Sequence, residues 1–334
     1  MQDKPDGSFF DAVEPLRGAL RLHCYRMLGS SHDGDDMVQE TMLRAWRARE
    51  SLDDPGLLRP WLYRIATNVC LDELKSRPRR MLVSDTCPPM DPLAPFAPAI
   101  DEPIWLEPVP DTWLGSARDP SPAARYTLKE SVALAFVAAL QLLPPAQRAT
   151  LLLRDVVGLS AEETASALGL SVGAANSALF RARTAVEQRL GGRDVASIAA
   201  STQPVDEALL ARYVRAFEDS NIEALVALLH ADVKTTMPPA PMWLDGRAAN
   251  EAFFRKMFSA PKWPPGGLRV LRIGANAQSA FAFYHSPLRG EPVRLHAIDV
   301  IDVRHGVIVG IHHFMMQAVF PLFGLPAELP ATPK

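Results

Sequence analysis

The stretch SAEETASALGLSVGAANSALFRARTAVEQR, residues 160–189, predicts two helices joined by a tight turn. Ser160 is a suitable N-cap for the first helix, and two glutamates follow in the first turn, where the helix dipole favours negative charge. Gly169 is placed to end this helix because glycine tolerates the left-handed backbone of a helix end. Ser171 then caps the second helix. The plan is typical of a helix-turn-helix that reads DNA, although any helical hairpin can share it.

The second helix of this stretch has two unlike faces. The residues that we expect to face inward are Ala175, Leu179 and Val186. The residues that we expect to face elsewhere are Asn176, Ser177, Phe180, Arg181 and Arg183. Arginine, asparagine and serine on an exposed face suit contacts with phosphates and base edges. On this segment alone, DNA binding and an ordinary solvated hairpin are equally open.

Length, composition, net charge and cysteine count limit the class of protein that this chain can be. With 334 residues the chain is long enough for two or three domains, and 48% hydrophobic residues suffice for buried cores. The formal net charge of −3 gives no overall attraction to nucleic acid, so any basic surface must be local. The three cysteines lack metal-ligand spacing, and Cys24 and Cys70 fall in apolar helical patterns typical of core thiols in a reducing compartment. We expect neither a metal nor a cofactor.

The sequence predicts neither a signal peptide nor a membrane-spanning segment. The first residues, MQDKPDGSFF, lack the apolar run of a signal peptide. No segment offers about 20 uninterrupted apolar residues, so no membrane-spanning helix is expected. These observations predict a cytoplasmic protein with no membrane partner.

Helical segments come first along the chain and strands come last. The helices that we expect lie at 9–28, 36–48, 60–74, 205–229 and 246–258, with more within 126–190 and a polar break at 31–36. The strands that we expect lie at 268–273, 279–284, 293–303 and 307–314, in a curved antiparallel sheet. The expected fold class is multidomain: two all-α domains, the second with the helix-turn-helix, plus a C-terminal α+β domain. The boundaries that we expect are 1–80, 81–125 (an acidic, proline-rich linker), 126–192, 193–204 (a second linker) and 205–334.

The first linker has an unusual composition. Ten of the chain's 30 prolines lie between Pro88 and Pro122, and seven acidic residues lie between Asp85 and Asp119. Such a segment predicts an extended acidic connector. Its embedded apolar residues Ile104, Trp105, Leu106 and Trp113 leave two interpretations open, packing against a neighbouring domain or docking in a groove.

A second informative segment is RPWLYRIATNVCLDELKSRPRR, residues 59–80, with six basic and two acidic residues. Trp61 and Tyr63 alternate with Arg59, Arg64 and Asn68, a mixture that suits unpaired bases. Taken alone, the segment is better explained as a core helix with a solvated arginine face.

Together and in this order, the two segments resemble the sigma-70 family of bacterial RNA polymerase sigma factors, in its small extracytoplasmic-function (ECF) type. The matching residues are DDMVQETMLRAW, RPWLYRIATNVCLDEL and LQLLPPAQRATLLLRDVVGLSAEETASALGLSVGAANSALFRAR. The resemblance implies a factor that binds core RNA polymerase, through its β′ clamp helices and β flap, and recognises and melts promoter DNA. It implies no covalent chemistry, so the chain is expected not to be an enzyme.

The resemblance also implies residue roles. Polymerase binding falls on Val38, Gln39, Glu40 and Arg44. The resemblance assigns recognition and melting of the −10 element to Leu52, Arg59, Trp61, Arg64 and Asn68, with Asn68 at the flipped-out base. Recognition of the −35 element falls on Ser171, Asn176, Ser177, Phe180, Arg181 and Arg183. Asn176 and Ala178 stand where the family often has basic residues, which weakens phosphate attraction and leaves the −35 preference open.

The segment after residue 204 resembles the SnoaL-like (NTF2-like) α+β cone fold, in which a sheet encloses an apolar pocket. The residues behind this are VDEALLARYVRAFEDSNIEALVALLHADV, MPPAPMWLDGRAANEAFF and VIVGIHHFM. Trp243, His296 and Asp299 are the candidates for a ligand pocket, together with His230, Asp232, Asp245 and His312. The family includes cyclases, isomerases and non-catalytic binders, so the fold does not fix the function.

The leading hypothesis is therefore an ECF-type sigma factor regulated by its fused C-terminal domain, with a small molecule or a protein as the regulator's partner. The alternative is a small-molecule-converting enzyme, a cyclase or isomerase, with a DNA-targeting helical half. A repressor or activator that binds duplex DNA without polymerase is a third hypothesis, but it leaves the 59–80 segment unexplained.

Overall fold

The computed structural model describes residues 7–100, 104–116, 127–190, 206–261, 263–264 and 266–330. The chain divides into two compact units, each described here by itself. The helical unit comprises residues 1–80 and 111–199, and the cone unit comprises residues 81–110 and 200–334. The expected linker at 193–204 lies outside the described residues.

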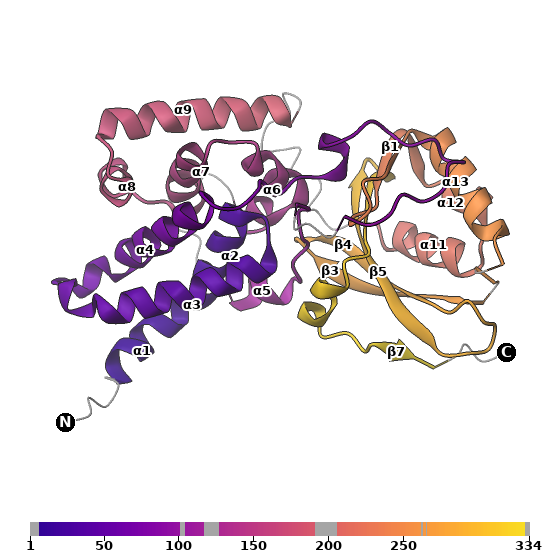
Figure 1. Cartoon of the computed structure of the whole chain (residues 1–334), viewed down its shortest axis with the longest axis horizontal. Coiled ribbons are helices and arrows are strands. Elements are labelled where there is room, and N and C mark those ends of the chain that lie inside the picture. Colours follow the sequence, from indigo (N-terminus) through magenta and orange to yellow (C-terminus); the bar gives the residue numbers. More distant parts are fainter. Residues whose placement is uncertain are drawn as a thin grey trace. The chain divides into compact units, whose positions relative to one another are not determined.

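The first part of the helical unit is a set of packed helices (Figure 1). They are α1 (Gly7–Val13), η1 (Glu14–Leu16), α2 (Arg17–Leu28), α3 (Ser31–Arg47), η2 (Arg49–Ser51), η3 (Pro55–Leu57) and α4 (Leu58–Glu73). The predicted helical end at residue 28 is confirmed, and Gly29 follows it with a left-handed backbone, φ 72°. The expected break at 31–36 is wrong, because the Ser30 side chain accepts a hydrogen bond from the Asp33 N–H and starts α3 at Ser31.

The second part contains the helix-turn-helix. Its elements are α5 (Thr112–Ser116), η5 (Glu130–Val132), α6 (Leu134–Gln141), α7 (Pro145–Leu151), the π-helical η6 (Leu152–Val157), α8 (Ala161–Leu168) and α9 (Val172–Arg189). The predicted cap at Ser160 is confirmed as a full capping box with Glu163. Gly169 ends α8 at φ 64°, and the Ser171 side chain accepts from the Ala174 N–H at the start of α9. The sequence therefore predicted this motif almost residue by residue.

The two helical parts share one hydrophobic core, which runs from Val13 to Val186. Buried polar contacts join them. Arg148 is 2% exposed, and its guanidinium donates to the Met27 carbonyl and to the Gln141 side chain, the latter at 2.6 Å. Arg26, also buried, donates to Ser131 at 2.8 Å. The two expected all-α domains thus pack as one unit in this structure.

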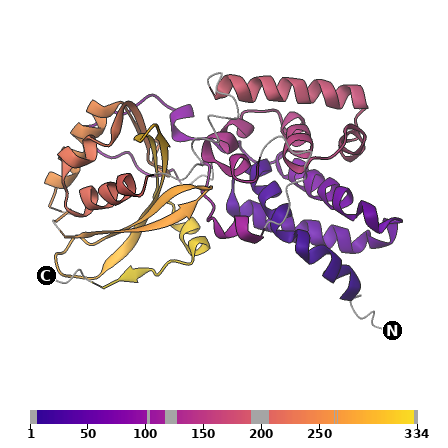
Figure 2. The same ribbon diagram turned by 180° about the vertical axis from the view of Figure 1, so that it is seen from behind.

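In the described part of the cone unit, helices lie on one side of a curved sheet (Figures 1 and 2). The helices are α11 (Glu207–Glu218), α12 (Ile222–Val226) and α13 (Arg247–Ser259). The strands are β1 (Leu229–Thr236), β2 (Trp243–Asp245), β3 (Leu268–Ala275), β4 (Gln278–His285), β5 (Val293–Arg304), β6 (Val307–Phe314) and β7 (Glu328–Leu329), while η4 (Val83–Asp85) and η7 (Gln317–Phe323) are short 3-10 helices. Register shifts between β4 and β5 and between β5 and β6 mark irregularities that curve and twist a sheet.

Two expectations for the cone unit need correction. The sheet order is β2-β1-β6-β5-β4-β3, and β1 runs parallel to β6, so the sheet is mixed rather than antiparallel. The expected helix at 205–229 is two shorter helices: α11 ends at Glu218 with Asp219 as its C-cap, and the Asn221 side chain caps α12 by accepting from the Ala224 N–H. The four predicted strands are confirmed, and the turn between the last two contains His305 and Gly306, both with positive φ.

The connector residues 81–110 belong to the cone unit. The Trp105 Nε1–H donates to the Pro239 carbonyl at 3.0 Å, and the Trp243 Nε1–H donates to the Cys87 carbonyl at 2.8 Å. Lys256 on α13 donates to the carbonyls of Leu93 and Ala94. The prediction of an extended linker is wrong in part, since η4 and α5 lie within 81–125, whereas its other described residues form no helix or regular strand. Of the two interpretations left open for Trp105, the structure shows packing against a domain. Trp113 instead packs in the helical unit, under Arg21 and beside Tyr25.

Candidate functional site

The outer face of α9 is the exposed surface of the helix-turn-helix. Its buried residues are Ala175, Ala178, Leu179, Ala182 and Val186. Its exposed residues include Ser171, Asn176, Ser177, Phe180 and Arg181. Phe180 is 71% exposed, which is unusual for so large an apolar side chain. The structure thus separates a core face from an open polar face that carries one aromatic ring, as the sequence predicted.

Arg183 is placed differently from the other −35 candidates. Its guanidinium makes two hydrogen bonds to the Asp155 carboxylate, Nε to Oδ2 at 2.8 Å and Nη2 to Oδ1 at 2.6 Å. Asp155 is 2% exposed and sits in the π-helical turn η6. This bidentate pair ties α9 to the helix that precedes the motif, so Arg183 has a structural use inside the helical unit.

The −10 candidates lie along α4 and the loop before it. Trp61, Arg64 and Asn68 follow helical spacing, and their side chains are half-buried, exposed and half-buried respectively. The buried face of α4 is Leu62, Tyr63, Ala66, Thr67, Val69 and Cys70. Leu52 is half-buried in the preceding loop. Arg64 and Asn68 therefore lie outside the core face, whereas Trp61 lies at its margin and packs in part against the core.

Arg59 is engaged within the helical unit. Its Nη2 donates to the Val157 carbonyl at 2.7 Å, and its guanidinium lies over the Tyr63 ring, 5.4 Å from the centroid. Val157 belongs to the second helical part, so the −10 segment and the helix-turn-helix part are held together at this point. In this arrangement Arg59 is committed to protein rather than presented to DNA.

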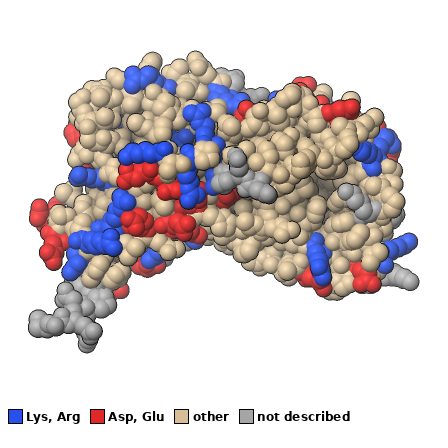
Figure 3. Space-filling view, in the orientation of Figure 1, with Lys and Arg blue, Asp and Glu red and all other residues tan. Residues whose placement is uncertain are grey.

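The basic cluster at 77–80 is also used internally. Arg77 and Arg80 both bind the Asp33 carboxylate, with N–O distances of 2.5 Å and 2.7 Å, and Arg77 pairs with Glu73 as well. Arg80 is 5% exposed. Sequence reasoning counted these bases toward nucleic-acid contact, but the pairing with Asp33, which is distant in sequence, could not be read from the local pattern. Figure 3 shows that basic and acidic side chains lie side by side over this unit.

The polymerase-binding candidates lie on α3. Gln39 and Arg44 are exposed and Glu40 is half-buried, whereas Val38 is 3% exposed and belongs to the core. Arg44 Nε donates to Glu40 at 2.7 Å, and Arg44 Nη1 donates to Asp72 at 3.3 Å. Val38 is therefore a packing residue, and an exposed contact on this helix is left to Gln39, Glu40 and Arg44.

A buried histidine lies beneath the −10 segment. His23 is 1% exposed, lies 2.9 Å from the Thr67 hydroxyl through Nε2, and meets the Tyr63 ring edge-on. Burial, together with the nearby Arg26 charge, lowers the pKa of His23 from 6.5 to about 3. His23 is therefore neutral at physiological pH and couples the stability of this unit to acidity.

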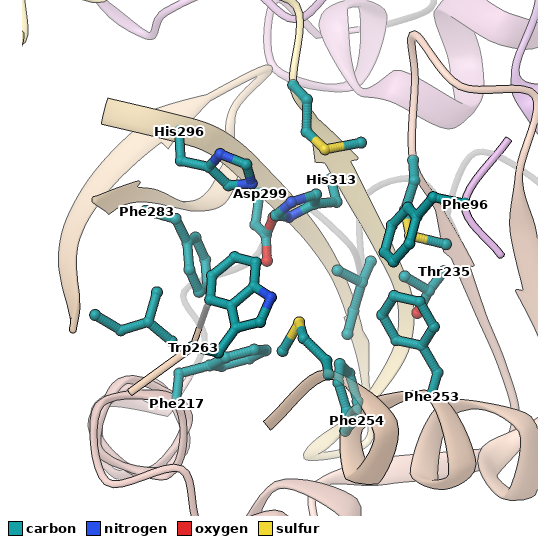
Figure 4. A pocket seen from close by; sticks show the side chains of 15 residues that line it. Phe96, Phe217, Thr235, Phe253, Phe254, Trp263, Phe283, His296, Asp299 and His313 are labelled. Carbon is teal, nitrogen blue, oxygen red and sulfur yellow. The ribbon is translucent and has the colours of Figure 1, made fainter. Parts of the chain in front are cut away.

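A cavity in the cone unit lies between the sheet and its helices (Figure 4). It has a volume of about 60 Å³. His296 and Asp299 line it as predicted, but Trp243 is absent from its walls and bonds the connector instead. The lining side chains also include Phe96, Phe217, Thr235, Phe253, Phe254, Met257, Trp263, Phe283, Ile311 and His313.

At the polar end of the cavity, two lining residues, Asp299 and His313, are joined by hydrogen bonds to the buried Tyr213 behind them. Asp299 is 1% exposed and accepts from the Tyr213 hydroxyl at 2.7 Å, while His313 Nδ1 lies 2.5 Å from its other oxygen. Burial, reinforced by Asp299, raises the pKa of the Tyr213 phenol well above its usual value and keeps it a donor. Sequence reasoning missed Tyr213 and His313 and favoured His312, which faces Thr236 and Asp302 instead. Adjacent residues of a strand point to opposite faces, and only the cross-strand register of Asp299 with His313 selects between them.

Metal sites and membrane-spanning helices can be assessed for residues 7–100, 104–116, 127–190, 206–261, 263–264 and 266–330. Within these ranges, no three or more His, Cys, Asp or Glu side chains are placed to hold a metal ion. No helix in the described part of the chain is both long and apolar enough to cross a membrane.

Comparison with known proteins connects both units to described families. The model "Sigma-70 region 2" matches residues 12–80, "Sigma-70, region 4" matches residues 133–186, and "SnoaL-like domain" matches residues 210–311. The ECF RNA polymerase sigma factor SigG of Mycobacterium tuberculosis is 41% identical over 333 residues, which is 98% of this chain and 86% of the relative.

Two further relatives are less similar. The ECF RNA polymerase sigma factor SigE of Mycolicibacterium smegmatis is 32% identical over 160 residues, 48% of this chain and 52% of the relative. The crystal structure of the extracytoplasmic function sigma factor SigJ of Mycobacterium tuberculosis aligns with a TM-score of 0.60 and 22% identity, covering 96% of this chain and all of that chain. At that identity the alignment shows a shared fold.

Proposed function

The chain belongs to the extracytoplasmic-function sigma factors of the sigma-70 family, and on that premise we propose how its parts divide the work of initiation. As a sigma factor it directs core RNA polymerase to promoter DNA. We place it in the cytoplasm with the polymerase and assign it no covalent chemistry of its own.

We assign −35 recognition to the open face of α9. The observation that carries this assignment is the exposure of Asn176, Ser177, Phe180 and Arg181 on a helix whose opposite face is core. Asn176 suits bidentate contact with adenine, and Arg181 suits a guanine edge or a phosphate. Arg183 is assigned to positioning α9, since Asp155 already binds its guanidinium.

We assign −10 recognition to Trp61, Arg64 and Asn68, with Leu52 beside them and Arg59 joining only after it leaves the Val157 carbonyl. Gln39, Glu40 and Arg44 are assigned to the β′ clamp helices. The shared core and the Arg59 contact hold the two promoter-reading parts together, so we propose that they separate when the factor engages polymerase and DNA.

Regulation is assigned to the cone unit through the connector. The connector joins the two promoter-reading parts in sequence, and in this structure it lies on the cone unit with both Trp105 and Trp243 hydrogen-bonded across that contact. A cone unit that holds the connector limits how far the two parts can separate.

Transcription with purified core polymerase tests these assignments. Full-length protein should initiate at discrete −35/−10 promoters. Arg181→Ala should lower promoter affinity and reduce its salt dependence by about one unit of slope, while Arg289→Ala, an exposed arginine of the cone unit, should change neither. No binding to core polymerase and no initiation would refute the assignment.

The regulatory part has its own test. Lys256→Met removes two hydrogen bonds to the connector, whereas Arg255→Met on the same helix removes only contacts to Glu223 and Glu251. We expect the first variant to change transcript yield and the second to match the wild type. Equal yields from both variants and from a chain ending near Pro204 would refute regulation through the connector.

One observation favours a catalytic alternative for the cone unit. An aspartate and a histidine in an apolar cavity can transfer protons, as the Asp299–His313 pair could. Both Asp299 oxygens are already engaged by Tyr213 and His313, however, so binding is the better supported function. Turnover of a polyketide-like or ketone substrate that is lost in Asp299→Asn would favour the alternative.

A further inference from the structure

The cavity of the cone unit has aromatic walls and few polar atoms. Phe217 comes from α11, Phe253 and Phe254 come from α13, and Phe283 comes from β4, and all four point into the cavity (Figure 4). Such walls favour a flat apolar molecule, which gains from burial and from ring contacts.

Two polar groups in the walls have complementary needs. Trp263 Nε1 is buried and has no hydrogen-bond partner among the described residues, and Figure 4 shows the indole nitrogen on the side of the ring that faces the cavity. A buried N–H without an acceptor is costly, so an acceptor atom there is favourable. His313 Nδ1 is held by Asp299, which leaves Nε2 as the ring atom for a ligand. In the tautomer that donates from Nδ1 to Asp299, Nε2 is the acceptor. One hydroxyl group meets both needs, since it accepts from Trp263 and donates to His313.

One wall of the cavity comes from the connector rather than from the cone fold. Phe96 lies against the Phe253 ring, with 5.6 Å between the centroids. Its segment is held by Lys256, which donates to the Leu93 carbonyl at 2.9 Å, and by the Ala97 N–H, which lies 3.0 Å from the Met242 sulfur. Phe96 itself is 45% exposed, so it is held less firmly than the fully buried rings of the cone core, and an apolar ligand in its place restores the contacts that it gives up.

The volume of the cavity decides how a ligand must enter. About 60 Å³ is room for a few water molecules. An aromatic ring needs more, since an apolar protein cavity of about 150 Å³ is the size that accepts benzene. A ring-sized ligand therefore fits only when Phe96 leaves its place.

We propose that this cavity binds a compact one- or two-ring apolar molecule with a single hydroxyl group, and that the ligand replaces Phe96 and loosens the connector. We call Phe96 the plug, because its ring occupies the place that the ligand needs and the two compete for it. The coupling to transcription rests on the regulatory function proposed above, whereas the binding site itself does not.

Calorimetric titration of the full-length protein with 1-naphthol tests the site. We expect saturable binding, weakened about three- to tenfold in Trp263→Phe and in His313→Phe, because each loses one hydrogen bond. Naphthalene, which has no hydroxyl group, should bind these two variants and the wild type equally. Phe96→Ala should bind 1-naphthol more tightly, about tenfold if the plug is seated nine-tenths of the time, while Leu93→Ala, 65% exposed in the same segment, should match the wild type.

The reactivity of a native thiol in the connector, that of Cys87, measures whether the connector loosens. Cys87 is half-buried and its Sγ lies 3.4 Å from the Pro241 carbonyl, whereas Cys24 and Cys70 are fully buried. Saturating 1-naphthol should raise the rate at which a thiol reagent labels Cys87 several-fold, Phe96→Ala should do so without ligand, and Cys87→Ser should remove the signal.

The outcomes separate the site from the regulation. No binding of 1-naphthol by the wild type or by Phe96→Ala overturns the site. Binding with an unchanged Cys87 rate overturns the coupling. Binding with faster Cys87 labelling but unchanged transcription supports the site and the coupling, and refutes only the regulatory function.

Discussion

Replacing Arg183 with alanine should destabilise the helical unit by about 3 kcal/mol. The Asp155 carboxylate is 2% exposed, and the Arg183 guanidinium binds both of its oxygens, at 2.8 Å and 2.6 Å. Removing one partner of a buried pair costs about 3–5 kcal/mol, because the remaining charge is buried without compensation. The Arg183 side chain is 35% exposed, so water offsets part of the loss and the lower end applies.

The expected loss corresponds to a fall of roughly 6 to 12 °C in the melting temperature of a unit of this size. Differential scanning calorimetry of the full chain measures it, with the two units treated as separate transitions. Arg181→Ala is the control. Arg181 is exposed on the same helix, so its loss should change stability by no more than about 0.5 kcal/mol while lowering promoter affinity.

A double-mutant cycle tests the cause. Removing both charges in Arg183→Gln with Asp155→Asn should recover much of the loss, with a coupling energy of about 2 kcal/mol. The reasoning is refuted if Arg183→Ala melts like the wild type and instead reduces the salt slope of promoter binding, because Arg183 would then be a phosphate contact.

The remaining predictions concern pH and the helix-turn-helix. Between pH 7.5 and pH 4.5, His23 should lower the free energy of unfolding of the wild type by about 2–3 kcal/mol. The reason is that His23 takes up a proton below pH 6.5 in the unfolded chain, whereas in the folded state, with a pKa of about 3, it does not. Stability is therefore lost as the pH falls, and His23→Gln, which can still bond Thr67, should lack this part of the pH dependence in urea titrations. Ser160→Ala removes the capping box and should cost about 1 kcal/mol by the same titration. Gly169→Ala should cost about 1–2 kcal/mol, because φ is 64° although the space beside it is open; an unchanged midpoint would contradict the left-handed backbone.

Many helix ends and strands could be predicted from short stretches of the sequence. Ser160, Gly169 and Ser171 set the ends of α8 and α9, because capping and left-handed glycine act within three or four residues. The four later strands were also predictable, since alternation of apolar residues is local. The parallel pairing of β1 with β6 was not, because it joins segments far apart in the chain.

The sequence by itself determined the family, the open face of α9 and two of the seven residues named for a pocket, His296 and Asp299. Only the tertiary structure decided which arginine side chains are engaged within the protein and which are left to contact DNA or polymerase. It pairs Arg183 with Asp155, Arg80 with Asp33 and Arg59 with the Val157 carbonyl, and it places Phe96 of the connector in the wall of the cavity. Such contacts form between residues far apart in the chain, and the burial that makes them strong exists only once the core has closed.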